Sequence, residues 1–379
     1  TEAVMTAVKL ARGVTKRDKI VIFANSYHGT FDGVLAVNLD GETHPMTIGT
    51  PYSLIEDVIV LNYGNEESFA QIEQYKDELA AVLVEPVQSR RPSLQPKAFL
   101  KGLRELTQKL DIALIFDETI TGFRTCSGGA QQYFGIEADL VIYGKAVGGS
   151  MPLSLVCGKR RYMDAIDGGS WQYGDDSHPS RETIFFGGTY VKHPLALAAA
   201  KAGLEQIKEQ GDALYQRLEA LMNRLVTGVN DFFKQQHVPM KMVHFSTMFR
   251  FESFGQYAIN LEPIELDLFF QLLIQQGIYT WERRICFLST AHSEDDVEQI
   301  ILAVKKAIMT MRAGGFVFST QSEPPSLVDE LIYQPLFAPQ PYLASAAQKR
   351  MFIVSKLDNV STTYNLAFGF HISGPFDGA

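Results

Sequence analysis

Residues 113–124 read ALIFDETITGFR, and this stretch decides the fold class. Its apolar part, residues 113–116, does not alternate with polar residues, which is typical of a parallel strand covered on both faces. Asp117 and Glu118 follow it directly. Because ligands of open α/β sheets bind at the carboxyl ends of parallel strands, we predict a buried strand with a functional site at its end.

Other short apolar runs share this texture and alternate with helical patterns. The predicted strands are Lys19–Phe23, Val58–Leu61, Ala81–Glu85, Leu140–Tyr143 and Leu155–Gly158. The predicted helices between and before them are Thr1–Arg12, with Thr1 as its N-cap, Ser68–Leu79 and Lys97–Leu110. The alternation predicts an α/β fold, in which a large domain has a mostly parallel sheet covered by helices.

The second half of the chain has a different pattern. Long helices are predicted at Pro194–Gln210, Asp212–His237, Glu265–Gln276 and Ser293–Met311, with strands at Lys241–Phe245 and Met248–Phe251. We therefore predict four segments: a large domain over 1–210 that lacks its N-terminal part, and a smaller α+β domain over 211–313. A linker rich in Pro and Gly over 314–340 and the truncated start of another domain over 341–379 follow.

Composition excludes several classes of protein. The 379 residues include 34 basic and 43 acidic side chains, a net charge of −9, which argues against a nucleic-acid or anionic-membrane partner. No apolar run reaches the ~18 residues that a membrane span needs. The three cysteines are isolated, so they form neither a disulfide framework nor a metal site. We expect a cytoplasmic protein.

Two residues stand out once nucleotide-binding and zinc-hydrolase motifs are found to be absent. Lys145 follows the strand Leu140–Tyr143 and is flanked by Gly144, Gly148 and Gly149, so it is either a Schiff-base amine or a solvated loop lysine. Asp117 is either a ligand-binding acid or the cap of the next turn. Taken alone, the two positions leave both alternatives open.

The surrounding motifs resolve this choice by resemblance. Residues 115–124, followed by GKAVGG at 144–149, closely resemble the class III pyridoxal-phosphate aminotransferases, and most closely the glutamate-1-semialdehyde aminomutase branch. Tyr27-His28-Gly29, Glu85-Pro86-Val87 and Gly188-Thr189 fit the same family in the same order, over residues 1–311. The resemblance implies a fold type I enzyme with pyridoxal 5'-phosphate (PLP) as its cofactor.

The resemblance also implies roles around the cofactor ring. Lys145 would bind PLP as a Schiff base and shuttle the substrate proton, while Asp117 would pair with the pyridine nitrogen. Tyr27 would stack on the ring with His28 in support. Thr119 stands where the family usually has Val against the ring.

Three more residues are assigned to the edge of the cofactor by the same resemblance. Thr1, at a helix N-terminus, would contact the phosphate. Thr189 would reach the phosphate across a dimer interface, which implies a homodimer. Glu85 would hold the polar network near the phenolic oxygen of the cofactor.

The C-terminal segment suggests that the chain is part of a larger, multidomain enzyme. Its motifs resemble the opening of a nonribosomal peptide synthetase condensation domain, at residues 344–351, 357–358, 363–365 and 372–377. An aminotransferase followed by such a domain resembles the hybrid polyketide–peptide synthetases of the iturin and mycosubtilin type. The predicted reaction is transfer of an amino group from a Gln or Glu donor to a β-ketoacyl thioester on a phosphopantetheinylated acyl carrier protein, with other synthetase domains as partners.

Two alternatives remain beside this prediction. One is a free-standing glutamate-1-semialdehyde 2,1-aminomutase, and the other is a non-catalytic scaffold segment of a synthetase. Arg90 and Arg91, adjacent in a loop after the Glu85 strand end, are predicted either to contact the carrier and its phosphate or to be a solvated surface pair.

Overall fold

The computed structural model describes residues 1–254, 264–280 and 284–316. The chain divides into two compact units, Thr1–Ser322 and Glu323–Ala379, and the described residues all belong to the first. The predicted condensation-like segment 341–379 and nearly all of the predicted linker 314–340 lie outside the described residues. The four-segment division stays a prediction.

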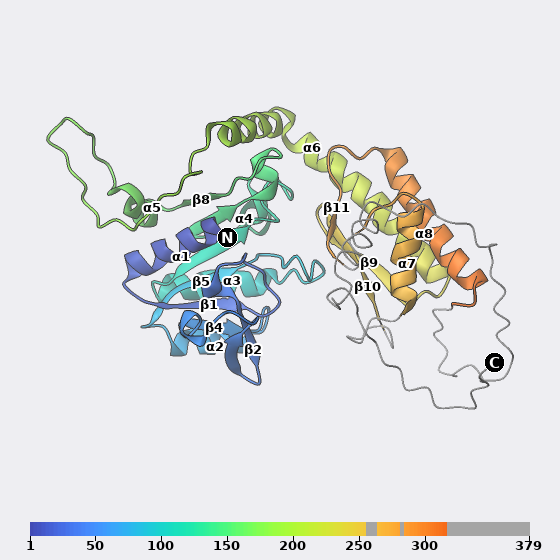
Figure 1. The fold of residues 1–379 in the computed structure, drawn as a ribbon, viewed down its shortest axis with the longest axis horizontal. Helices are drawn as coiled ribbons and strands as arrows, with labels where there is room; N and C mark the ends of the chain where they lie inside the picture. Colours follow the sequence, from blue (N-terminus) through green and yellow to red (C-terminus); the bar gives the residue numbers. More distant parts are fainter. Residues whose placement is uncertain (255–263, 281–283, 317–379) are drawn as a thin grey trace, which may run out of the picture. The chain divides into compact units, whose positions relative to one another are not determined.

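A six-stranded sheet forms the centre of the N-terminal part, in the order β4-β1-β5-β6-β7-β8 (Figure 1). Its strands are β1 (Lys19–Phe23), β4 (Val58–Leu61), β5 (Leu79–Val84), β6 (Ala113–Glu118), β7 (Leu140–Tyr143) and β8 (Leu155–Gly158). All neighbouring pairs are parallel except β7 with β8. The predicted α/β class with a mostly parallel sheet is confirmed.

Strand β8 is antiparallel because of its connection. Only the 3-10 turn η3 (Lys145–Gly148) and a short loop join β7 to β8. A parallel return needs a crossover of about a dozen residues or more, usually helical, so the chain turns back beside β7 instead. The residues of the strand were predicted correctly. Its direction was not, because it depends on the connection after β7, whose sequence shows no repeating apolar pattern.

Helices bury both faces of this sheet. On one face α1 (Glu2–Thr15) and α5 (Arg160–Asp167) pack against alternate residues of β6, including Ala113 and Ile115. On the other, α2 (Glu67–Gln74), α3 (Lys97–Lys109) and α4 (Gly129–Phe134) surround Leu114 and Phe116. Burial on both sides explains why the 113–116 run is apolar throughout.

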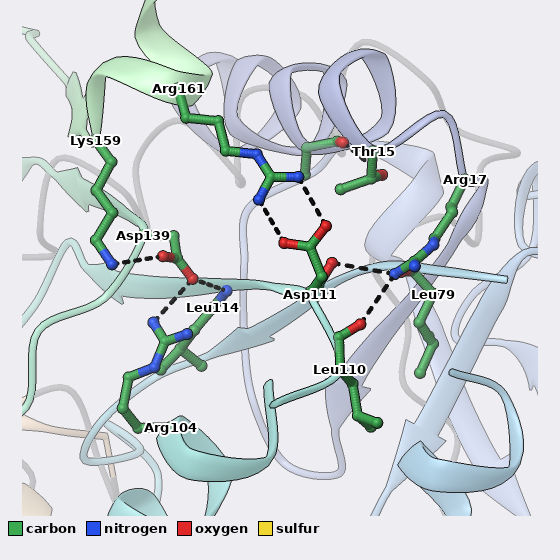
Figure 2. A network of polar contacts seen from close by, with 11 residues as sticks. Thr15, Arg17, Leu79, Arg104, Leu110, Asp111, Leu114, Asp139, Lys159 and Arg161 are labelled. Carbon is green, nitrogen blue, oxygen red and sulfur yellow. Dashed lines mark hydrogen bonds and ion pairs between the residues drawn. The ribbon is translucent and has the colours of Figure 1, made fainter. Parts of the chain in front are cut away.

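The amino edge of the sheet is braced by charged groups (Figure 2). Asp139, directly before β7, accepts hydrogen bonds from Arg104 Nη1 at 2.8 Å and from the Leu114 amide at 2.9 Å, and its other oxygen lies 2.9 Å from Lys159 Nζ. Asp111, before β6, pairs with both terminal nitrogens of Arg161. These contacts tie α3, β6 and the start of α5 together at the edge opposite the strand ends singled out above.

The remaining elements include some that the sequence pattern did not predict. A hairpin of β2 (Ala36–Leu39) and β3 (Glu42–Pro45) follows the short turn η1 (Asp32–Val34), and η2 (Tyr52–Leu54) precedes β4. Helix α6 (Pro194–Gln235) is interrupted at Gly211, where φ is 56° and ψ is −143°. This break agrees with the two helices predicted on either side of residue 211.

A second sheet, in the order β11-β10-β9, is antiparallel and lies against the last helices. Its strands are β9 (Met240–Phe245), β10 (Met248–Ser253) and β11 (Cys286–Phe287), and the helices are α7 (Ile264–Gln275) and α8 (Glu294–Ala313). Ser293 and Asp296 form the expected capping box at the start of α8. No helix within the described ranges is long and apolar enough to cross a bilayer.

Candidate active site

The carboxyl edge of the large sheet gathers most of the predicted site residues. Asp117 is the second-to-last residue of β6, Glu85 directly follows β5, and Lys145 comes two residues after β7. His28 is in the loop after β1, and the strand order places β1, β5, β6 and β7 side by side. Four segments distant in sequence therefore meet at one edge.

Asp117 is a buried acid held by two donors. One carboxylate oxygen lies 2.8 Å from Nδ1 of His28, and the other accepts the backbone N–H of Thr119 at 3.1 Å. Burial alone raises the pKa of Asp117, but the hydrogen bond and charge of His28, together with the Thr119 contacts, bring it below the usual value. Asp117 therefore stays ionised although only 4% of it is exposed.

Glu85 belongs to the same buried cluster. Its carboxylate accepts the backbone N–H of Tyr27 at 3.0 Å and that of Ser89 at 3.3 Å. Burial raises its pKa, His28 opposes that change, and the charge of Asp117 adds to it. Glu85 thus fixes the loop that carries Tyr27 and His28, while the ring of Tyr27 stays 46% exposed.

Lys145 begins the turn η3 in a conformation that is unusual for a residue with a side chain. Its φ is 48°, in the left-handed region, where a non-glycine residue costs about 1–3 kcal/mol. Burial lowers the pKa of its amine, Asp117 and Glu85 raise it, and the charge of Arg124 lowers it further. At the preceding Gly144, a Cβ atom would lie only 3.1 Å from Cγ2 of Thr119, so Thr119 packs closely on the backbone that presents the lysine.

Thr1 meets the loop that carries His28. It occupies the N-cap position of α1, but its side chain makes no capping bond, which differs from the prediction. Its hydroxyl accepts the backbone N–H of Thr30 at 3.0 Å instead. Gly29 between these groups has φ 90°, and a Cβ there would lie 2.6 Å from the Thr1 hydroxyl oxygen. Only glycine fits this approach.

Thr189 is the predicted site residue that the fold of one chain does not bring to the cluster. It is exposed, in an irregular segment before α6, and no hydrogen bond joins it to the other predicted residues within the described ranges. Its predicted role requires a second subunit, and that role stays a prediction.

Three residues near the edge were not assigned to the site from the sequence. Gln88, fully buried, donates to the carbonyl of Ala24 at 2.8 Å and to the Ser26 hydroxyl at 2.9 Å, so it supports the loop after β1. Glu118 accepts the amides of Ala130 and Gln131 at 2.6 and 3.0 Å and thereby fastens α4 to β6. The third residue is Arg124, in the turn after β6. The signal for Glu118 was its place beside Asp117, because alternate residues of a strand point to opposite faces.

Comparisons with known proteins show the family of this chain. Residues 1–308 match the model of the family described as aminotransferase class-III. The chain belongs to the class III aminotransferases. It is 36% identical over 323 residues to the glutamate-1-semialdehyde 2,1-aminomutase of Thermodesulfovibrio yellowstonii, covering 81% of this chain and 71% of that protein.

Solved structures of class III aminotransferases and related transaminases share the fold. An omega-transaminase from Sphaerobacter thermophilus superimposes with a TM-score of 0.72 and 31% identity, over 82% of this chain and 72% of that one. A transaminase with PLP bound gives 0.73 at 26% identity, over 83% and 73%. A beta-phenylalanine aminotransferase from Variovorax paradoxus gives 0.68 at 27% identity, over 82% and 69%. The protein is a PLP-dependent transaminase, as predicted.

The residues of this class III aminotransferase fit PLP chemically. A pyridine nitrogen that must stay protonated needs a partner that stays ionised, and Asp117 has the lowered pKa that this requires. A covalent cofactor needs an amine that loses its proton readily, and burial lowers the pKa of Lys145. Nε2 of His28 is buried without a hydrogen-bond partner among the described residues, so the cluster has an open polar position.

Proposed function

We propose that Lys145 is the residue that binds PLP and moves the proton of the substrate carbon during transfer of an amino group. The observation that carries this proposal is a lysine of lowered pKa at the strand edge that also holds the buried pair of Asp117 and His28, in which Nδ1 of the histidine lies 2.8 Å from the carboxylate. When bound, PLP supplies an electron sink for the negative charge that develops on the substrate carbon. The protein then has to position the substrate, hold the ring nitrogen protonated and provide one base.

The other predicted residues support this arrangement in distinct ways. Asp117 would hold the ring nitrogen of PLP, and His28 keeps Asp117 ionised. Glu85 holds the backbone of Tyr27, whose half-exposed ring is available to cover the cofactor. Thr1 presents its hydroxyl beside the loop containing Gly29 as a phosphate contact.

The first prediction concerns Lys145. In the PLP-loaded protein, Lys145→Ala should remove the visible absorption band of the lysine-bound cofactor and reduce turnover by at least about a thousandfold, because the covalent anchor and the base are the same group. Lys101→Ala, at an exposed position of α3, is the control and should keep both. A Lys145→Ala protein with the band and turnover intact would remove this residue from its role.

Two substrates are candidates for the second half of the reaction, a β-ketoacyl thioester and glutamate 1-semialdehyde. The comparisons favour the second, which was predicted as the alternative. The curated relatives are glutamate-1-semialdehyde 2,1-aminomutases, at 30–36% identity over about four fifths of the chain. By this similarity the substrate would be glutamate 1-semialdehyde, whose amino group moves between neighbouring carbons.

The proposal that the substrate is a β-ketoacyl thioester has different support. It rests on the resemblance of residues 341–379 to a condensation domain, which lies outside the described residues. The solved neighbour named a beta-phenylalanine aminotransferase also acts, by its name, on an amino group at the β position. Arg90 and Arg91 are exposed in the turn after Glu85, where they are available to an acidic carrier.

The second prediction separates the two acceptors. The PLP-loaded chain is given either glutamate 1-semialdehyde alone, or glutamate or glutamine with a carrier-bound β-ketoacyl chain. Chromatography of the small molecules detects the isomeric product in the first case, and intact-mass spectrometry of the carrier detects the product in the second. An aminomutase converts the first without a donor, at constant mass. A β-ketoacyl aminotransferase replaces the ketone oxygen of the second with an amine. In that case Arg90→Ala with Arg91→Ala should slow carrier amination, most at low salt, and spare the donor half-reaction.

The surface before α6 suggests how the subunits associate. Large apolar side chains are exposed there, among them Tyr173 at 97%, Phe185 at 84% and Tyr190 at 80%. Several large apolar side chains exposed along one segment are typical of an interaction surface. We therefore propose a homodimer through this segment, which would bring Thr189 to the site of the partner subunit.

A further inference from the structure

Arg124 is a largely buried cation without an anionic partner within the described ranges. Its Nε atom is buried and has no hydrogen-bond partner there. The guanidinium carbon lies 4.4 Å from the ring centre of Phe287 in β11, and burial lowers the pKa of the group. An unpaired charge removed from water is costly, and a ring face compensates it only in part. The arrangement therefore leaves the guanidinium with unused capacity for an anion.

The position of Arg124 connects this capacity to the reaction. It closes the turn after β6, and this turn packs on the strand that leads to Lys145. The ring centres of Phe123 and Tyr143 are 5.1 Å apart, and a Cβ atom on Gly122 would lie 2.5 Å from Cδ1 of Tyr143. The charge of Arg124 also acts on the amine of Lys145. Arg124 and Lys145 therefore belong to the same region of the site.

Contacts from α6 and from the turn between β9 and β10 hold the backbone at Arg124 in place. The Ser246 hydroxyl donates to the Arg124 carbonyl at 2.8 Å, and the Tyr215 hydroxyl donates to the carbonyl of Phe123 at 3.4 Å. With its backbone bound from one side and its guanidinium stacked on Phe287, the residue is preorganised. Preorganised donors bind a ligand without the cost of ordering a free side chain.

We propose that Arg124 binds the carboxylate of the amino-acid substrate. This inference rests on the proposed transamination at Lys145. Under either acceptor the enzyme takes a substrate with both an amino group and a carboxylate, either glutamate 1-semialdehyde or the amino-acid donor. This carboxylate lies within a few bonds of the reacting carbon, so its receptor must lie near the lysine. Guanidinium presents planar, paired N–H donors that match the two oxygens of a carboxylate. Arg124 is thus a specificity residue for substrates that carry this group.

The test compares Arg124→Met and Arg124→Lys with the wild-type chain, all loaded with PLP. Glutarate, an unreactive dicarboxylate, is titrated by calorimetry. We expect Arg124→Met to weaken its binding about 10- to 100-fold, the range for one charge-assisted hydrogen-bonded contact, and Arg124→Lys to weaken it less. In the donor half-reaction, kcat/KM for glutamate should fall by a similar factor, whereas benzylamine, which has no carboxylate, should react within about threefold of wild type. Arg161→Met, in an exposed ion pair at the opposite edge, is the control and should change neither.

Several outcomes would overturn the proposal. Unchanged glutarate affinity in Arg124→Met would do so, as would equal loss of reactivity toward glutamate and benzylamine. A matching loss of PLP affinity in equilibrium dialysis would show that the anion is the cofactor phosphate. If Arg124→Met fails to fold, Arg124→Lys decides, because it keeps the charge and loses the planar donors. Failure of the proposed transamination looks different: the wild-type protein would lack the absorption band, while its glutarate binding would still report on Arg124.

Discussion

At the scale of single residues, His28 decides the charge of the site. It is buried with Asp117, and its hydrogen bond and charge offset the burial that would otherwise raise the pKa of that acid. Glu85, Lys145 and Thr119 also interact with the pair. A buried carboxylate without a donor gains a proton more easily. His28 is therefore a positioning residue that keeps Asp117 in the form PLP needs.

The third prediction follows from this dependence. In His28→Asn the pKa of Asp117 should rise, because the interaction with His28 no longer offsets burial. Asp117 would then gain its proton at a higher pH than in the wild type, so the acidic limb of the kcat/KM profile should shift to higher pH. Turnover at neutral pH should fall about 10- to 100-fold. His178→Asn, at an exposed position, is the control and should leave the profile unchanged. A uniform loss at every pH would contradict this role for His28.

At the scale of elements, the covered strands were predicted well and the short connections were not. Lys19–Phe23 and Val58–Leu61 match β1 and β4 to the residue, because burial on both faces demands an unbroken apolar run. β11 has only two residues. The hairpin strands β2 and β3 are as long as β4, but they are mostly not buried and include polar residues, so no apolar run marks them and none of the three was predicted.

The same division applies to the site. Asp117 and Lys145 could be singled out because strand ends and flanking glycines are local signals. The stacking of Arg124 on Phe287 joins distant parts of the sequence, and no local pattern contains it. Gln88 was not predicted for the same reason, since its partners Ala24 and Ser26 lie far before it in the chain.

The fourth prediction concerns the brace around Asp139. Burial raises the pKa of Asp139, but the Leu114 amide, Lys159 and Arg104 outweigh it, so the folded-state value is lowered (Figure 2). A group with a lowered folded pKa adds stability above its unfolded value of about 3.9, and that contribution is lost as the pH falls through the folded value. Asp139→Asn should reduce the free energy of unfolding at pH 7 by about 1–3 kcal/mol.

Urea denaturation from pH 7 down to pH 3 measures this effect. The gap between wild type and Asp139→Asn should narrow as the solution becomes more acidic. Asp57→Asn serves as the control, because Asp57 is 41% exposed and lies 3.9 Å from Lys19. Its cost should be below about 1 kcal/mol, as for other surface pairs. A gap that stays constant with pH would mean that the charge of Asp139 does not stabilise the fold.

At the scale of the whole molecule, the last prediction asks whether one subunit completes the site of another. Thr189 is exposed on the apolar segment before α6, whereas Lys145 lies at the carboxyl edge of the sheet. Lys145→Ala and Thr189→Asp should each be nearly inactive as homodimers, the latter because its charge repels the cofactor phosphate. In a mixed dimer, the intact lysine of one subunit meets the intact threonine of the other. Random reassociation of equal amounts makes half of the dimers mixed, each with one complete site, so activity should recover to about a quarter of wild type. If Thr189 serves its own subunit, mixing restores nothing, because no chain then carries both residues.

The control for this prediction is the state of association. Size-exclusion chromatography with light scattering verifies that the mixed species are dimers. The double substitution Phe185→Asp with Tyr190→Asp, in the exposed apolar segment, should abolish both the dimer and the recovery of activity.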